Sequence, residues 1–298
     1  MNMSRFYCDA PSRAVIAIGG DDRVSFLQAL ISNDVTELPP DHARWAALLT
    51  PQGKYLCDFF VVAGVDRLLI DVEAAGAADL LTRLKRYRLR AKVTFDLLAE
   101  AGVLLGWGED AAADFGLAMP GQGAAIGETM VIVDPRLDRL GIRVIGDRAE
   151  ARRLLERTGF VAGEFPAWDM VRLEAGVPDG TRDLVPEQSI LLEAGFDELH
   201  GVSWTKGCYI GQELTARTKY RALIKKRLLP VRITGPVPEF GAAVTQDGKD
   251  VGEMRSAQGE WGLALLRLET LQQGPYHCGD ATLIPVVPGW LNIPVPSI

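Results

Sequence analysis

The sequence predicts an α+β protein that ends in a small, all-β, barrel-like domain. Three observations support this fold class. Helical and strand-like spacings of apolar residues alternate over the first 225 residues. The last 73 residues hold short strand candidates separated by prolines. A length of 298 residues corresponds to about two domains. We therefore expect one domain over 1–225 and a second over 226–298.

Three stretches of the first domain have the apolar spacing of a helix, and two of them begin at an aspartate that can cap the first turn. Gly159 follows the third stretch, at the position where helices commonly end. The expected helices are 21–37, 74–86 and Asp147–Thr158.

Short apolar runs predict the strands. Gly64–Arg67 lies between two such runs and predicts a tight turn. In the first domain the expected strands are Phe59–Val62, Leu68–Ile70, Lys92–Asp96, Val103–Leu105, Met130–Val133 and Ile142–Ile145. Asp247-Gly248 is a hairpin signal in the second domain. The strands expected there are Val231–Thr234, Ala243–Thr245, Asp250–Met254, Trp261–Arg267 and Ala281–Val287.

The composition is that of a globular protein, and it excludes several classes of function. Hydrophobic residues make up 48% and the net charge is −7, so wholesale disorder and general nucleic-acid binding are not expected. The four cysteines form no close pair and there are only three histidines, so a self-contained metal site is not expected. No apolar run approaches the length of about 20 residues that spans a membrane. These features predict a soluble, cytoplasmic protein.

One cysteine, Cys208, stands in a context that favours chemistry. Gly207 and Gly211 flank it and permit a tight turn or the close approach of a ligand or partner. Lys206 lies two residues before the thiol, and a nearby ammonium favours the thiolate. A helix that began near Gly211 would act in the same direction. The alternative interpretation is a small buried cysteine in a structural loop.

The segment Lys206–Glu213, KGCYIGQE, resembles the signature of the YgfZ-type proteins, relatives of the glycine-cleavage T-protein (aminomethyltransferase) that act in iron–sulfur cluster assembly or maintenance. The resemblance covers roughly residues 20–230 of this chain. Further segments similar to that family are Asp22–Gln28 with Ser32–Val35, Leu49–Lys54, Tyr87–Val93, Arg172–Gly176 and Pro186–Gln188.

This resemblance implies a three-lobed aminomethyltransferase-like fold around a central channel that binds tetrahydrofolate. Glu174 is the candidate reader of the pterin, because a carboxylate can accept two hydrogen bonds from its amino-pyrimidinone edge. The alternative for Glu174 is a surface acid on a helix. The other candidate folate contacts are Asp58, Arg172, Lys206 and Tyr209.

At one position the sequence departs from the aminomethyltransferases. They carry an acidic pair after the glycine turn, whereas this chain has Cys57-Asp58 and lacks one of the two acids. That difference argues against aminomethyl transfer.

Basic residues gather in two clusters, each with six lysines or arginines, at 83–92 and 217–227. Such local fields attract anions even in an acidic chain. The candidate anions are a folate tail, especially a polyglutamylated one, an acidic protein, or RNA, although only Tyr87 and Tyr220 could stack on bases. The alternative is a solvated helix face.

The leading hypothesis is a tetrahydrofolate-binding accessory factor in iron–sulfur cluster assembly or repair, with Cys208 and Lys206 at the reactive site. Cys208 would be a transient cluster ligand or a redox-active thiol. Because clusters usually take four thiolates, a cluster on Cys208 would be shared with a cluster carrier, a client protein, a second copy or glutathione. Two alternatives are a folate-dependent aminomethyl or one-carbon transferase, and a binding protein associated with tRNA modification. No membrane partner is expected, and nucleic acid is not expected as the main one.

Overall fold

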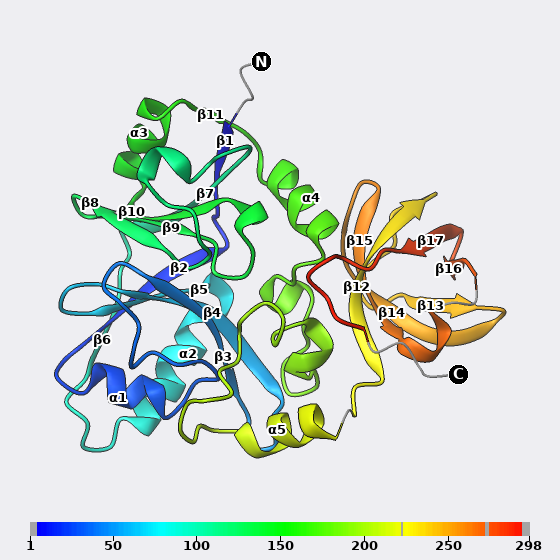
Figure 1. The fold of residues 1–298 in the computed structure, drawn as a ribbon, viewed down its shortest axis with the longest axis horizontal. Coiled ribbons are helices and arrows are strands. Elements are labelled where there is room, and N and C mark those ends of the chain that lie inside the picture. The colour runs from blue at the N-terminus through cyan, green and yellow to red at the C-terminus, as the bar shows by residue number, and fades with distance from the viewer. Residues whose placement is uncertain (1–4, 222, 272–273, 294–298) are drawn as a thin grey trace. The chain divides into compact units, whose positions relative to one another are not determined.

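The computed structural model describes residues 5–221, 223–271 and 274–293, and it confirms the α+β fold with a C-terminal β-barrel (Figure 1). The chain divides into two compact units. Unit 1 consists of Met1–Leu49, Leu56–Trp168 and His200–Ile210, and unit 2 of Thr50–Tyr55, Asp169–Leu199 and Gly211–Ile298. Unit 2 thus takes in segments that precede residue 226.

One sheet of unit 1 has six strands in the order β11-β1-β7-β10-β9-β8. The side chain of Asp147 accepts hydrogen bonds from the backbone N–H groups of Ala149 and Glu150, as a helix cap should, so the expected third helix is present as α3. Leu154 and Leu155 of α3 pack with the buried face of the sheet. The bounds are β1 Arg5–Asp9, β7 Ala101–Trp107, β8 Gly123–Ile126, β9 Thr129–Val133, β10 Ile142–Asp147, β11 Phe160–Ala162 and α3 Arg148–Arg157.

The other sheet of unit 1 has the order β3-β4-β5-β2-β6, and the predicted turn at Gly64–Arg67 joins β4 to β5. Phe26 and Leu27 of α1 and Leu80 and Leu84 of α2 share a core with this sheet. The bounds are β2 Arg13–Gly19, β3 Ala43–Leu49, β4 Tyr55–Ala63, β5 Leu68–Glu73, β6 Thr94–Leu97, α1 Arg23–Gln28 and α2 Ala74–Tyr87.

Helix α1 is much shorter than the predicted 21–37. After Gln28 the chain turns, and its polar side chains bond to other segments instead of continuing the helix. The Ser32 hydroxyl donates to the carbonyl of Gly201, and the Asn33 amide donates to the carbonyls of Trp45 and His200. These bonds fix the segment that follows α1 against residues 200–201.

Unit 2 contains a closed barrel in the order β12-β15-β14-β13-β16-β17. Asp247 and Gly248 both have positive φ, 49° and 74°, as the expected two-residue hairpin requires. Leu229, Val231, Met254 and Leu266 belong to the barrel core. The bounds are β12 Lys226–Thr234, β13 Ala243–Gln246, β14 Lys249–Gln258, β15 Trp261–Arg267, β16 Tyr276–Cys278 and β17 Ala281–Pro285.

Two further helices complete the regular structure, α4 Phe165–Ala175 and α5 Gln212–Tyr220. Short 3-10 turns are present at Ala113–Phe115, Asp138–Leu140, Gly180–Arg182, Leu191–Ala194 and Leu268–Thr270. Among the residues that the structure describes, no helix combines the length and apolar character needed to cross a membrane.

Candidate functional site

Cys208 is the exposed thiol of this chain. Cys8 and Cys278 are buried and Cys57 is half-buried. Burial raises the pKa of Cys8 to about 12, and burial together with neighbouring Asp58 raises the pKa of Cys57 to about 12. Burial also raises the pKa of Cys278. Because the thiolate is the form that binds metal, Cys208 is the thiol best placed to do so.

The backbone beside the thiol is open. A Cβ built on Gly207 would meet no other atom within 4 Å, and Gly207 itself is exposed. Gly211 has a φ of 81° directly before α5, so it supplies the tight turn. The two glycines near Cys208 therefore have different roles. Gly207 leaves room for another molecule to approach the backbone, and Gly211 allows the chain to turn into α5.

Lys206 is buried, and its ammonium is directed at the backbone. It donates to the carbonyl oxygens of Gln28, Ile31 and Asn33 at 2.8, 2.7 and 2.6 Å. Burial lowers the pKa of Lys206 to about 8, and the charge of Asp34 opposes that shift. All three N–H donors are used by the last residue of α1 and the segment that follows it. We therefore assign Lys206 to holding the Cys208 loop, in place of the expected role in activating the thiol.

Two other predicted folate contacts of unit 1 are also buried. The carboxylate of Asp58 accepts a hydrogen bond of 2.8 Å from the indole N–H of Trp45, and only 4% of Asp58 is exposed. Tyr209 is buried with its ring 5.1 Å from the Lys206 ammonium. The structure thus brings Lys206 and Tyr209 together and places Asp58 against Trp45.

In unit 2, Arg172 and Glu174 both lie on α4 but in contrasting surroundings. Arg172 is fully buried, and its guanidinium donates to the carboxylates of Asp169 and Asp183, to the carbonyl of Val177 and to the hydroxyl of Ser256 in β14. Arg172 therefore links α4 to the barrel, a structural role in place of the expected folate contact. Glu174 is exposed.

A buried ionic network in unit 1 escapes the sequence analysis. Its three arginines lie over the ring of Phe60, with the Arg143 guanidinium 3.9 Å from the ring centroid. Burial alone would raise the pKa of Asp134, but the charges and hydrogen bonds of Arg136 and the charge of Arg143 hold it below its ordinary value. One sequence signal could have indicated this network. Arg13 begins the segment RAVIAIG, at a position where the alternation of a β-strand points a side chain into the core. The members are Arg13, Asp71, Asp134, Arg136 and Arg143.

The described residues contain no group of three or more His, Cys, Asp or Glu side chains that could hold a metal ion.

Comparisons with known proteins give relatives over most of the chain. The mouse protein named iron-sulfur cluster assembly factor IBA57, mitochondrial, is 33% identical, and the alignment covers 93% of this chain and 83% of the relative. The human protein of that name is 34% identical with the same coverage. A homolog from Pyricularia oryzae is 32% identical over 87% of this chain and 71% of its own length.

The fold has a solved counterpart. The crystal structure of the glycine cleavage system aminomethyltransferase T from Bartonella henselae superposes with a TM-score of 0.75 at 17% identity, covering 95% of this chain and 85% of that one. The family model of the CAF17 C-terminal beta-barrel domain matches residues 225–293. The aminomethyltransferase-like fold and the terminal barrel are thereby confirmed.

One prediction from the sequence is wrong. The absence of a recognisable signal predicted a cytoplasmic protein, whereas the relatives are mitochondrial proteins. The sequence features used for that prediction report only on secretory signals and membrane spans, and they do not discriminate between reducing compartments.

Proposed function

Because the chain belongs to the IBA57 family of iron–sulfur cluster assembly factors, we propose that it assists cluster assembly by lending Cys208 as one ligand to a cluster that a partner protein carries. The observation that carries this proposal is an exposed thiol on a loop whose neighbouring residue, Lys206, is fixed by three hydrogen bonds. A thiol held in this way can be offered to a partner without reordering the loop.

The ligand count makes the partner necessary. Iron–sulfur clusters are usually held by four thiolates, and Cys208 is the exposed cysteine here. The cluster is therefore cargo, with its other ligands supplied by the second molecule. On ligation the Cys208 thiol loses its proton and its sulfur takes a coordination position on iron that a labile ligand vacates.

We expect Cys208→Ser to abolish formation of a shared cluster. The purified variant would be mixed anaerobically with a carrier protein loaded with a [2Fe–2S] cluster, and the mixture followed by visible circular dichroism and size-exclusion chromatography. Wild-type protein should give a new spectrum and a co-eluting coloured complex. Cys278→Ser, which alters a buried thiol, is the matched control and should behave as wild type. A coloured complex of unchanged yield with Cys208→Ser would refute the role of this thiol.

Gly207→Val tests the approach of the partner while keeping the thiol. Because the space around Gly207 is open, the fold should tolerate the larger side chain. Complex formation should nevertheless fall about tenfold or more, since the added methyl groups stand where the partner would contact the backbone. Unchanged melting temperature with unchanged complex formation would show that the partner does not approach on this side.

We further propose that Glu174 contacts the pterin of tetrahydrofolate. The support is the exposed carboxylate on α4 within a fold shared with a glycine-cleavage aminomethyltransferase. When bound, tetrahydrofolate supplies a reduced pterin whose amino-pyrimidinone edge donates hydrogen bonds. Glu174 suits this role because its carboxylate is exposed, whereas Arg172 and Asp58 are buried.

We expect Glu174→Gln to weaken tetrahydrofolate binding about tenfold, because a charge-assisted hydrogen bond contributes about 1.5–3 kcal/mol. Isothermal titration calorimetry under anaerobic conditions would measure the affinity. Glu239→Gln removes an exposed carboxylate elsewhere in unit 2 and serves as the control. Equal affinities for the two variants would contradict the assignment.

A further inference from the structure

A cationic hollow of about 510 Å³ lies at the C-terminal end of α2. We use the name cationic hollow for the residues that line it: Lys85, Arg86, Arg88, Leu89, Arg90, Ala91 and Lys92. Within the described part of the chain, the side chains of Lys85, Arg86, Arg88 and Arg90 make no hydrogen bond or ion pair. Lys92 is 3.9 Å from the exposed carboxylate of Asp21. The hollow therefore concentrates positive charge that the protein itself leaves uncompensated.

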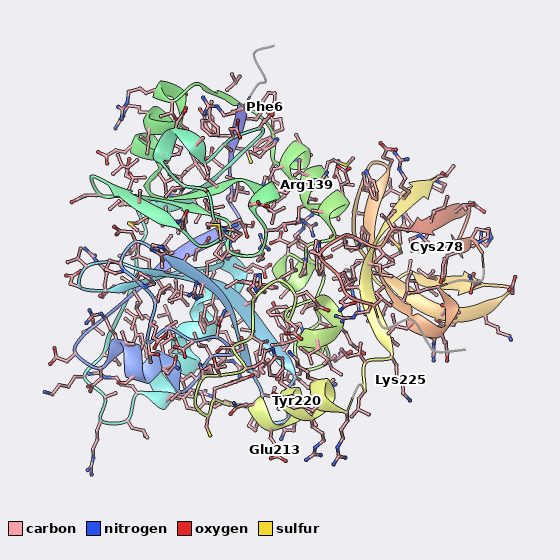
Figure 2. The ribbon with its side chains drawn as sticks, in the orientation of Figure 1. Phe6, Arg139, Glu213, Tyr220, Lys225 and Cys278 are labelled. Carbon is pink, nitrogen blue, oxygen red and sulfur yellow. The ribbon has the colours of Figure 1, made fainter. Side chains whose placement is uncertain are left out.

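The second basic cluster, at 217–227, is different. Three of its cations are neutralised within unit 2, by the ion pairs Arg217–Glu213, Lys219–Asp197 and Arg227–Glu198 at 2.7, 2.9 and 2.6 Å. Figure 2 labels Glu213 and Tyr220 on α5, near the first and last residues of this helix. Among the described residues, the cationic hollow keeps four cations without an ion pair, whereas the second cluster keeps three, Arg221, Lys225 and Lys226.

One exposed apolar side chain, Leu89, lies among the basic residues that line the cationic hollow. Leu89 is 89% exposed and has a φ of 43°. A leucine rarely adopts this left-handed conformation, because its Cβ crowds the following carbonyl oxygen. Glycine would avoid both the strain and the exposure of an apolar side chain. A strained, exposed leucine inside a basic cluster indicates a residue kept for contact with another molecule.

Hydrogen bonds fix the backbone that forms the cationic hollow. The N–H of Ala91 donates to the carbonyl of Arg88 at 2.8 Å, and the N–H of Lys92 donates to the carboxylate of Asp22 at 2.7 Å. The N–H of Asp22 in turn donates to the carbonyl of Lys92 at 3.3 Å. Val93, which follows, is buried. A partner would meet a preformed surface and would lose little binding energy in ordering it.

The same helix connects the hollow to Cys208. Asp22, which fixes the hollow, stands at the N-terminal end of α1, and Lys206 of the Cys208 loop bonds to the carbonyls of Gln28 and Ile31 at the other end. Helix α1 has six residues, a length of about 9 Å. Figure 1 shows α1 as this short helix in unit 1. A single protein surface can span the two ends of a helix of this length.

We propose that the cationic hollow is a docking surface for an acidic protein segment that carries one apolar side chain, and that the partner which shares its cluster with Cys208 docks there. The second clause rests on the proposed function. The carboxylates of the segment would meet the four unpaired cations, and its apolar residue would cover Leu89.

The observations favour a protein over the other anions. A folate polyglutamate tail carries no apolar side chain to cover Leu89. A membrane surface is flat and does not match the concave shape of the cationic hollow. An anionic bilayer would also repel a protein with a net charge of −7. RNA binding uses several aromatic stacking platforms, whereas Tyr87 is the aromatic residue of this segment.

The test measures binding of a short fluorescent peptide of Asp and Glu residues with one central leucine, and of its serine version, by fluorescence anisotropy. Wild-type protein should bind the leucine peptide more tightly than the serine peptide, and both less tightly at about 300 mM than at about 50 mM salt. Arg88→Gln with Arg90→Gln should weaken binding about tenfold or more. Arg153→Gln with Arg157→Gln, two exposed arginines of α3, removes the same charge and should leave binding unchanged.

Leu89→Gly separates docking from folding. Glycine accepts the positive φ, so the melting temperature should stay the same or rise, while the preference for the leucine peptide should disappear. Cys208→Ser should leave peptide binding unchanged, so a failed cluster experiment and a failed docking experiment are distinguishable.

Three results would overturn the proposal. The first is equal weakening by the two arginine pairs. The second is tighter binding of pteroyl-tetraglutamate than of the leucine peptide, with no dependence on Leu89. The third is tighter binding to phosphatidylglycerol–phosphatidylcholine vesicles than to the peptide.

Discussion

Asp71→Asn should lower the free energy of unfolding by about 3–5 kcal/mol, because it leaves buried arginines without their counter-charge. The carboxylate of Asp71 is fully buried. It accepts from the Arg13 side chain at 2.7 Å and from two nitrogens of Arg143 at 2.9 and 2.6 Å. Asparagine keeps the shape of this side chain but removes the charge that both guanidinium groups share.

The remaining carboxylate of the network does not compensate. Asp134 is paired with Arg136 at 2.8 Å and lies 3.5 Å from Arg143. Arg13 would keep its bond to the backbone carbonyl of residue 71 and its place 5.6 Å from the Phe60 ring, but it would lose its ion pair with the Asp71 carboxylate. Since whole domains are stable by about 5–15 kcal/mol, the loss is a large share of the total.

Urea denaturation followed by circular dichroism would measure this effect, and the melting temperature should fall by about 10 °C. Asp66→Asn removes an aspartate that is 79% exposed and lies 3.3 Å from Arg67, so it should change stability by less than about 0.5 kcal/mol. Replacing Asp71, Arg13 and Arg143 together by apolar residues should recover much of the loss, because no buried charge then lacks a partner. A loss below about 1 kcal/mol for Asp71→Asn would show that water reaches the network.

The parts of the fold that the sequence predicted are those specified by local signals. The turn at Gly64–Arg67, the Asp147 cap of α3 and the Asp247-Gly248 hairpin each depend on a few adjacent residues, and each is confirmed. The apolar spacing of α2 predicted its bounds almost to the residue, 74–86 against Ala74–Tyr87. Local chemistry decides such elements, and a sequence displays it directly.

The parts that the sequence did not predict depend on partners far along the chain. The apolar spacing of 21–37 continues past Gln28, but bonds from Ser32 and Asn33 to residues 45, 200 and 201 end the helix. Arg172 matched a motif, yet a serine 84 positions away is among the groups that engage it. Long-range partners of this kind override local propensity and have no signature in a single sequence.

The candidate site divides in the same way. The motif around Cys208 was found from its glycines and lysine, and the exposure of the thiol agrees with a chemical role. The separation of two positions between Lys206 and Cys208 predicts an ion–thiol contact. The structure instead gives its ammonium to carbonyls about 175 positions earlier, which the spacing of a motif could not reveal.

Lys206→Met should both destabilise unit 1 and reduce cluster sharing at Cys208. The change removes the donor of three hydrogen bonds. The carbonyl oxygens of Gln28, Ile31 and Asn33 then lose this donor and must be hydrated instead. We expect a loss of about 2–4 kcal/mol, from about 1–3 kcal/mol for each buried acceptor with partial relaxation. Lys54→Met is the control, because Lys54 is partly exposed and bonds to the single carbonyl of Gln188.

The effect of Lys206→Met should also depend on pH, and the sign follows from the burial. Burial lowers the pKa of Lys206 to about 8, against an ordinary value of 10.5 in the unfolded chain. Between these two values the unfolded state binds the proton and the folded state does not, so raising the pH favours folding through this group. The neutral amine still donates two hydrogen bonds, and the cost of burying a charge is gone.

The stability deficit of Lys206→Met relative to wild type should therefore grow by about 1–3 kcal/mol between pH 8 and pH 10.5, since one unit of difference in pKa corresponds to about 1.4 kcal/mol. Parallel urea titrations of both proteins across that range would measure the deficit. A deficit that is constant or shrinks would mean that the three carbonyls keep Lys206 charged, and that the loop presents Cys208 through an ammonium at every pH at which the protein is folded.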